Sequence, residues 1–351
     1  MIILQEYGRK ERIAVLANNA FGIDLGTSNI KIYNRTDDSV FVEKNMIAIE
    51  NKKNLFAYGD DAFEMYEKAP DNINISYPLS NGVIADIQNM ELLVKYFLSD
   101  LMKNSIRPAD YYIAVPWDVT EVEKRAFKDL IKEANVKARK VMVVDKAVAD
   151  GLGLGIDVKN SQGVLVVNVG FDTTEISILS LGGIVLSRLI KVGGRKFDDA
   201  IKSAVRREFS LIIGGKTAET VKTSLLDLEE QRLGALVYGR DIVTGLPVER
   251  EIPTTLVDEC LIEHFNVIID NIKVILERTP PELAADIYRH GLYLTGGASQ
   301  VSNLAQLMSK GTGLKVNVSE NPVTSVALGL GKIINDDNYK TVAYAIEGMS
   351  K

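Results

Sequence analysis

The residues best suited to phosphate chemistry lie in the stretch 21–33. Asp24 stands between apolar residues there, and a turn of one glycine and three small polar residues, Gly26 to Asn29, follows it. Apolar and polar residues then alternate, so the pattern predicts a strand, a tight turn and a second strand. Consecutive amides in such a turn can wrap a phosphate group, and Asp24 is placed to hold a hydrated Mg²⁺ against it. An ordinary hairpin with a solvated acid is the alternative.

A second stretch repeats this arrangement later in the chain. An apolar strand, residues 163–170, enters a polar turn at 171–174 and leaves through a second strand at 175–179. Two such turns from two similar halves would be able to clamp a phosphate chain from both sides. The glycine turn at 296–297 is a third candidate, because it follows a strand and opens a helix, a place suited to a phosphate or a nucleoside.

Composition narrows the class of protein. The chain has 351 residues, 46% of them hydrophobic, which is enough for two sizeable cores, so we expect two domains. The net charge of −6 argues against a nucleic-acid-binding protein, because such proteins normally carry a basic face. The single cysteine, Cys260, excludes an intrachain disulfide, and two histidines leave little material for a zinc site or a catalytic triad.

The sequence also bears on location. No apolar run is long enough to span a membrane. The first residues, 1–7, form too short and too acidic a segment for a secretory signal, so we expect a cytoplasmic protein.

Strands and helices alternate along the rest of the chain, which is typical of an α/β fold. The clearest predicted helix covers residues 118–135, with Asp118 as its cap and Glu121 as the reciprocal partner. Val122 then begins an apolar face at helical spacing. Other helices are expected at 60–69 and 254–277.

The order and spacing of these motifs resemble the actin/Hsp70/sugar-kinase superfamily. Finer features resemble MreB, the bacterial actin family, in four segments: 82–86, 122–126, 180–185 and 279–283. The resemblance implies an actin-like ATPase fold, in which two RNase H-like domains each carry a small subdomain and ATP occupies the central cleft. The implied subdomains are IA at 1–45, 86–157 and 327–351, IB at 46–85, IIA at 158–197 and 254–326, and IIB at 198–253.

The resemblance also implies a nucleotide site for ATP or ADP. The residues that match the two phosphate-binding turns are Gly26, Thr27, Ser28 and Asn29, and Gly170, Phe171, Asp172 and Thr173. Those that match the nucleoside pair and the adenine-side turn are Glu219 and Lys222, and Gly296, Gly297 and Ala298. For Glu219 and Lys222 a solvated surface pair is the alternative. The positions of the Mg²⁺-associated residues are Asp24 and Asn168, and the catalytic positions are Asp145, Lys146 and Thr173.

The catalytic positions depart from the family pattern. MreB proteins usually have two glutamates before a proline where this chain has Asp145, Lys146 and Ala147, and an aspartate where it has Asn168. A charged lysine has no lone pair with which to accept a proton from the attacking water, and a shorter acid is misplaced. We therefore predict weak or altered ATP hydrolysis. Either Lys146 lies near the terminal phosphate, or it points to solvent and another residue orients the water.

The resemblance implies partners as well: head-to-tail homopolymers, typically antiparallel double protofilaments at the membrane, and paralogous actins. Such filaments support cell shape, or cell helicity and motility. Two small apolar patches suggest peripheral membrane contact at the inner face of the cell membrane, although ordinary packing is the alternative. The patches are Ile2, Ile3 and Leu4, and Met102 and Ile106.

Two other functions in the superfamily compete with this prediction. A small-molecule kinase needs an acid aimed at a substrate hydroxyl, and the sequence offers no convincing candidate. A chaperone ATPase needs a peptide-binding domain, and we expect none because the chain ends shortly after the last predicted domain helix.

Overall fold

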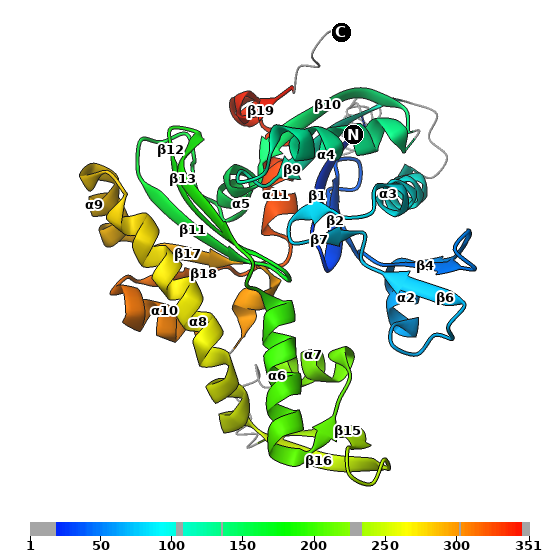
Figure 1. The fold of residues 1–351 in the computed structure, drawn as a ribbon. Helices are drawn as coiled ribbons and strands as arrows, with labels where there is room; N and C mark the ends of the chain where they lie inside the picture. The colour runs from blue at the N-terminus through cyan, green and yellow to red at the C-terminus, as the bar shows by residue number, and fades with distance from the viewer. Residues whose placement is uncertain (1–18, 103–107, 135, 225–233, 302, 346–351) are drawn as a thin grey trace, which may run out of the picture. The chain divides into compact units, whose positions relative to one another are not determined.

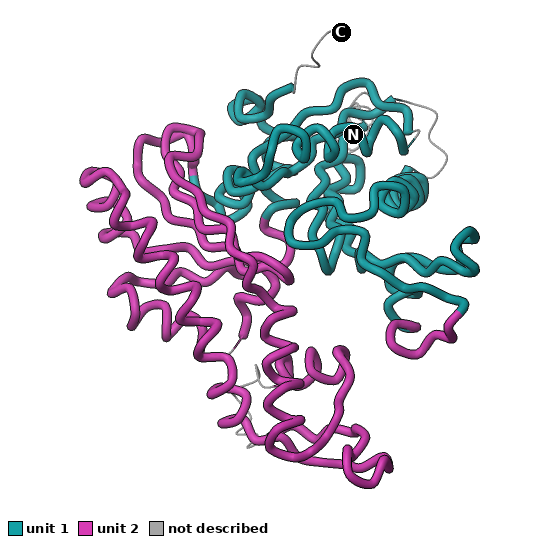
Figure 2. The backbone as a smooth tube through the Cα atoms, in the orientation of Figure 1, with its two compact units in different colours: residues 1–64, 72–156, 326–351 teal, residues 65–71, 157–325 magenta. Residues whose placement is uncertain are grey.

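The computed structural model describes residues 19–102, 108–134, 136–224, 234–301 and 303–345 (Figure 1). Contacts along the chain divide it into two compact units (Figure 2). Unit 1 comprises residues 1–64, 72–156 and 326–351, and unit 2 comprises 65–71 and 157–325. The finer division into four subdomains stays a prediction.

Unit 1 is built on a six-stranded sheet in the order β19-β10-β9-β1-β2-β3. Its strands are β1 (Ala20–Leu25), β2 (Asn29–Asn34), β3 (Ser39–Lys44), β9 (Ala109–Val115), β10 (Ala138–Asp145) and β19 (Ala343–Tyr344). The predicted hairpin over 21–33 is confirmed, since β1 and β2 are antiparallel. β9 is buried at every position and pairs in parallel with both β1 and β10, as expected of an almost wholly apolar central strand.

Helices and smaller sheets complete unit 1. The other elements are β4 (Ile47–Glu50), β5 (Asn54–Tyr58), α2 (Gly59–Met65), β6 (Ile73–Ser76), β7 (Leu79–Ser80), β8 (Val83–Ile84), α3 (Ile87–Met102), α4 (Glu121–Glu133), α5 (Lys146–Gly153), α11 (Ser325–Asn335) and η2 (Asp337–Val342). Glycines let α11 pack closely: a Cβ on Gly329 would lie 1.7 Å from the carbonyl oxygen of Ala149 in α5. A larger residue at that position would force the two helices apart.

The start of α4 differs from the sequence prediction. Thr120, not Asp118, caps the helix, and its hydroxyl and the Glu123 carboxylate form a reciprocal capping box. Glu121 is therefore not the capping partner. The side chain of Val122 is 76% exposed, whereas Phe127 and Ile131 are buried. The apolar face begins later than predicted. In the first turn of α4 the inward position is taken by Lys124, whose aliphatic stem is buried.

Unit 2 repeats the strand order of unit 1 in a second sheet, β13-β12-β11-β17-β18. Its strands are β11 (Val164–Val169), β12 (Thr174–Ser180), β13 (Gly183–Ile190), β17 (Leu292–Thr295) and β18 (Val316–Val318). β11 is antiparallel to β12 and parallel to β17, just as β1 is antiparallel to β2 and parallel to β9. The two halves therefore have similar sheets, as the sequence suggested.

Helices and a small sheet complete unit 2. These elements are α6 (Gly194–Phe209), β14 (Leu211–Ile212), α7 (Gly215–Ser224), β15 (Gly234–Asp241), β16 (Pro247–Pro253), α8 (Thr254–Glu277), α9 (Pro281–His290), η1 (Gly297–Gln300) and α10 (Leu304–Thr312). The helix predicted at 254–277 is confirmed as α8. Phe197 and Ile201 of α6 and Phe265 of α8 join one buried core with the main sheet, and α6 runs alongside α8 in Figure 1.

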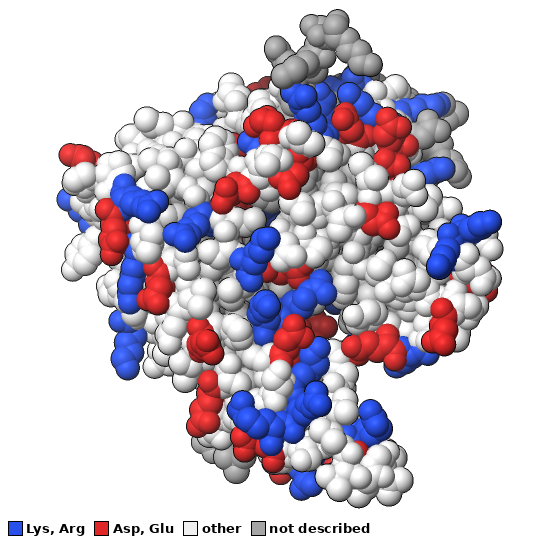
Figure 3. Space-filling view, in the orientation of Figure 1, with Lys and Arg blue, Asp and Glu red and all other residues white. Residues whose placement is uncertain are grey.

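The charged surface is mixed on the face that Figure 3 views, where Lys and Arg side chains are interspersed with Asp and Glu. Among the described residues, no helix combines the length and apolar character that crossing a membrane requires.

Candidate nucleotide site

The first turn, residues 26–28, joins β1 to β2 and is held by backbone and side-chain bonds. The Gly26 amide donates to the Asn29 carbonyl at 3.1 Å, and the side chain of Asn45 donates to the Gly26 carbonyl at 2.9 Å. The Asn45 amide also donates to the carbonyl of Ser28. A Cβ on Gly26 would lie 2.7 Å from both the Asn29 oxygen and the Lys31 ammonium, so only glycine fits this turn without a shift. These bonds hold the turn in a compact form.

Asp24, at the end of β1, lies between two lysines. Its Oδ2 is 3.1 Å from the Nζ of Lys31, and its Oδ1 is 3.1 Å from the Nζ of Lys146. The Asp24 side chain is almost fully buried, at 3% exposure. Burial alone would raise its pKa, but the charges of Lys146 and Lys31 outweigh burial and lower the pKa to about 2. Asp24 is therefore ionised and neutralised by protein groups.

The two positions predicted to be catalytic, Asp145 at the end of β10 and Lys146 after it, face different partners. Asp145 accepts a hydrogen bond of 2.8 Å from the hydroxyl of Tyr344, and burial raises the pKa of this carboxyl. Lys146, the first residue of α5, reaches Asp24 and keeps only 19% of its side chain exposed. Lys146 thus reaches Asp24 beside the first turn rather than pointing to solvent; which residue orients the water stays a prediction.

The second turn, residues 170–173, has the same backbone closure as the first. The Gly170 amide donates to the Thr173 carbonyl at 2.8 Å. The start of α6 is bonded to this turn, because the amides of Gly194 and Arg195 donate to the carbonyls of Gly170 and Phe171 at 3.0 and 2.7 Å. The N-terminus of α6 and the turn therefore form one unit of structure, with helix amides beside the turn.

Predicted site residues from three separate segments meet around Gly194. A Cβ on Gly194 would lie 3.3 Å from the Phe171 ring, 3.4 Å from the Cβ of Ala298 and 3.5 Å from the Nζ of Lys222. The turn after β17 lies close by: a Cβ on Gly296, whose φ is +90°, would lie 2.6 Å from the side-chain oxygen of Asn168. Tertiary structure therefore brings together, within unit 2, residues that the sequence only related by motif.

Lys222 is buried and bonded within the unit. Its Nζ donates to Asp198 Oδ1 at 2.7 Å and to the Gly194 carbonyl at 3.4 Å. Burial raises the pKa of Asp198 to about 6, although Lys222 acts in the opposite direction. Glu219 is half-buried one turn earlier on α7. With Lys222 only 7% exposed, a solvated surface pair does not describe this arrangement.

The residues at the two metal positions do not fit a directly held Mg²⁺. Mg²⁺ prefers carboxylate and water oxygens in octahedral geometry, but both oxygens of Asp24 already face ammonium groups. Asn168, at the equivalent position of unit 2, is neutral. Among the described residues, no group of three or more His, Cys, Asp or Glu side chains is placed to hold a metal ion.

Four residues of these half-sites were missed in the sequence. They are Lys31, Asn45, Arg195 and Asp198. Lys31 had a signal, because a three-residue turn places it directly opposite Asp24 in the hairpin. Arg195 donates to Asp172 Oδ1 at 2.6 Å and stacks on the Phe171 ring, a contact made across more than twenty residues that no local pattern predicts.

One predicted membrane residue lies in the described part of the chain. Met102, at the end of α3, is half-buried, and its sulfur accepts from the Tyr111 hydroxyl at 3.7 Å. It packs against the core of unit 1. The other four, Ile2, Ile3, Leu4 and Ile106, lie outside the described residues.

Comparisons with known proteins identify the family. The family model described as MreB/Mbl protein matches residues 18–341. The cell shape-determining protein MreB of Escherichia coli strain K12 is 36% identical over 327 residues, which cover 90% of this chain and 93% of that protein. The crystal structure of MreB5 of Spiroplasma citri bound to ADP superposes with a TM-score of 0.86 at 35% identity, covering 93% of this chain and 98% of that one.

A more distant structure supports the fold. MamK, solved as a double helical filament, gives a TM-score of 0.76 at 21% identity over 91% of this chain and 99% of that one. This likeness concerns the fold alone. Together with the repeated sheets and turns of the two units, these matches show that the chain is a member of the MreB/Mbl family of bacterial actin homologues and has the actin-like α/β fold.

Proposed function

We propose that the chain binds ATP and ADP through the first turn of unit 1 and through the second turn, Lys222 and Ala298 of unit 2. The observation that carries this proposal is the meeting of Phe171, Lys222 and Ala298 around Gly194. MreB5 of Spiroplasma citri, of similar sequence and fold, was solved bound to ADP.

Calorimetric titration with ATP and with ADP tests nucleotide binding. The pair Asp198→Asn with Lys222→Met removes a buried ion pair without changing net charge, and we expect it to weaken ADP binding at least about tenfold. The matched control is Asp199→Asn with Lys202→Met, a more exposed pair within α6 with a 2.8 Å contact, which should leave affinity unchanged. Absence of adenine nucleotide uptake by the wild-type protein would refute the proposal.

We propose further that the nucleotide-bound protein assembles into filaments that support cell shape. Support comes from family membership, since the E. coli relative is a cell shape-determining protein. Pairing of protofilaments in antiparallel register, copolymers with paralogous actins and a role in helicity or motility stay predictions. High-speed pelleting with and without ATP tests assembly: the protein should appear in the pellet only with nucleotide.

Hydrolysis should be weak in these filaments. Lys146, which while charged has no lone pair to accept a proton, lies against Asp24. Asp145 is held through Oδ1 by the Tyr344 hydroxyl and is one methylene shorter than glutamate, so its remaining acceptor sites are displaced from the position of the attacking water. Phosphate release is therefore expected to be slow in the wild type and faster in the double variant Lys146→Glu with Asn168→Asp, which restores two acids. Brisk release by the wild type would contradict this part of the proposal.

Dependence on Mg²⁺ should also be weak. Lys31 and Lys146 bring two positive charges to the first turn against the single charge of Asp24, so the turn itself offers a net positive charge to the phosphates. We expect ADP affinity to change less than about tenfold when Mg²⁺ is replaced by a chelator. Lys146→Gln should increase that change. A wild-type protein that binds nucleotide only with Mg²⁺ would show that the two lysines do not take over this role.

Peripheral membrane contact remains a proposal with a direct test. Each apolar patch is small, so only a polymer with many copies would bind firmly. Filaments should co-float with anionic liposomes, and Ile2→Asn with Ile3→Asn should reduce that fraction. If these substitutions left the floating fraction unchanged, the N-terminal patch would not be a membrane contact.

A further inference from the structure

Unit 1 contains a cavity of about 250 Å³ near the starts of the parallel strands β1, β9 and β10, away from the first turn. Ala20, the first residue of β1, lines this cavity, whereas the turn follows Leu25 at the other end of the same strand. The other lining residues come from β9, β10, α11, η2 and the residue after β2. This cavity is therefore distinct from the nucleotide half-site of unit 1.

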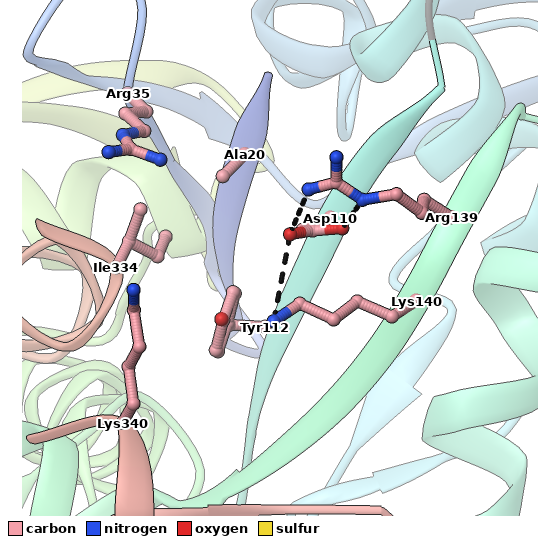
Figure 4. A pocket seen from close by; sticks show the side chains of 8 residues that line it. All are labelled: Ala20, Arg35, Asp110, Tyr112, Arg139, Lys140, Ile334 and Lys340. Carbon is pink, nitrogen blue, oxygen red and sulfur yellow. Dashed lines mark hydrogen bonds and ion pairs between the residues drawn. The ribbon is translucent and has the colours of Figure 1, made fainter. Parts of the chain in front are cut away.

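Basic side chains dominate the lining, and we call the cavity the basic pocket. Four of its eight lining residues are basic and one is acidic: Arg35, Arg139, Lys140 and Lys340, with Asp110. In Figure 4 Arg139 and Lys140 approach from β10, while Arg35 and Lys340 approach from the opposite side near Ile334. This concentration of one sign of charge contrasts with the mixed surface of Figure 3.

Asp110 positions two of these cations. Its side chain is 10% exposed, and its oxygens accept two bonds from Arg139, one of them 2.7 Å long from Nε. The Nζ of Lys140 lies 3.6 Å from Asp110 Oδ2 and 5.2 Å from the centre of the Tyr112 ring. A guanidinium has five N–H donors, so three remain on Arg139 beyond the two that Asp110 uses. Asp110 thus orients Arg139 without exhausting it.

The opposite side of the basic pocket is held by different contacts. The Arg35 amide donates to the Ala20 carbonyl at 3.1 Å, which fixes the backbone of Arg35 at the mouth. Lys340 pairs with Asp337 on the same turn of η2, but Asp337 has a side chain that is 87% exposed and does not line the cavity. An exposed ion pair is screened by water, so Lys340 still contributes charge to the cavity.

We propose that the basic pocket binds a small anion that bears a phosphate group. Two arginines favour phosphate, because the planar fork of a guanidinium matches two phosphate oxygens at once. The volume is below that of sites for drug-sized ligands and suits a phosphate with a short polar substituent. Such a group can come from a soluble phosphate ester or from the headgroup of a phospholipid.

The test uses the full-length protein and the double variant Arg35→Gln with Lys340→Gln. This variant leaves the largely buried Asp110 with both of its cationic partners, Arg139 and Lys140, so we expect it to fold like the wild type. Calorimetric titration with glycerol 3-phosphate should show binding to the wild type that is weakened at least about tenfold in the variant. The control is Lys128→Gln with Lys132→Gln, which removes the same charge from α4 and should bind like the wild type.

Vesicles identify the source of the phosphate. Co-sedimentation with phosphatidylglycerol vesicles that is lost in the double variant but kept in the α4 control indicates a lipid headgroup. Binding of glycerol 3-phosphate without any vesicle effect of the variant indicates a soluble ester. The proposal is overturned if neither probe binds, or if the double variant binds both probes as the wild type does.

Discussion

The turns after β1 and β11 have the same backbone closure but different charged side chains beside them. In unit 1 the hairpin register places Lys31 opposite Asp24, and in unit 2 the equivalent register places Glu175 opposite Asn168. Each turn is closed by a hydrogen bond that a glycine amide donates to a carbonyl three residues later, from Gly26 in one unit and from Gly170 in the other. The repeated strand arrangement therefore fixes the backbone of the turn, whereas the charged side chains beside the turn differ between the two units.

Burial separates the two turns further. The ion pairs of Asp24 involve a carboxylate with 3% exposure and lysines with 13% and 19% exposure. In unit 2 the Arg195 partner of Asp172 is 37% exposed. Loss of one partner from a buried ion pair costs much stability, because water cannot solvate the charge that remains. In an exposed pair water solvates the remaining charge, so the loss costs little. The first turn should therefore be the more sensitive to changes of charge, and the second turn the more tolerant.

The largest expected effect comes from Asp24→Ala. Removing the acid takes the shared carboxylate away from two half-buried lysines, which should lower the free energy of unfolding by about 3–5 kcal/mol. Trp117 is the single tryptophan and lies in unit 1, so its fluorescence during denaturant unfolding reports on that unit. Asn168→Ala in unit 2 is the comparison and should leave the Trp117 transition in place. If Asp24→Ala unfolded at the same denaturant concentration as the wild type, the two lysines would not depend on this acid for stability.

A smaller effect is expected when alanine replaces the glycine of each turn. A Cβ on Gly26 meets a backbone oxygen at 2.7 Å, whereas one on Gly170 meets its nearest atom at 3.0 Å. We expect Gly26→Ala to lower the free energy of unfolding by about 2 kcal/mol and Gly170→Ala by about 1 kcal/mol. Thermal unfolding followed by circular dichroism measures both. The reverse order would mean that the second turn is the more rigid one.

The pH dependence should distinguish the buried acids of the two units. Asp24, with a pKa of about 2, stays ionised between pH 5 and 7 and adds no slope there. Asp198 has a folded pKa of about 6, above its usual value, so the native state takes up a proton as pH falls and gains stability. From pH 7 to 5 the wild type should gain about 1 kcal/mol over Asp198→Asn.

Denaturant unfolding at several pH values measures that difference. Asp24→Asn provides the contrast, since its offset from the wild type should be constant over the same range. A wild-type advantage over Asp198→Asn that grows with rising pH would have the wrong sign and would contradict the raised pKa.

The smallest effect should follow Arg195→Lys in unit 2. The charge beside Asp172 is kept, but the fork to the carboxylate and the stacking on Phe171 are lost. Because Arg195 is partly exposed, we expect a decrease of less than about 1 kcal/mol in unfolding free energy. A loss as large as that of Asp24→Ala would remove the distinction between a sensitive and a tolerant turn.

Local patterns predicted much of the fold. Apolar alternation around Asp24, the continuous apolar run of β11 and the periodicity of α8 each reflect interactions within a few residues, which is why both hairpins and the long helix were found. The start of α4 was misplaced because Asp118 and Thr120 both offer a capping side chain, and only three-dimensional packing selects between them.

The sequence by itself determined the two hairpin turns, the glycines that they need and the residue types at Lys146 and Asn168, from which we predict the phosphate contacts and the weak hydrolysis. Only the tertiary structure decided what those residues contact. Lys146 reaches Asp24 because β10 ends two strands away from β1, and Phe171, Lys222 and Ala298 meet because α6, α7 and β17 converge. Charge pairing and close packing depend on distances in space, and these are set by the whole fold rather than by neighbours in the chain.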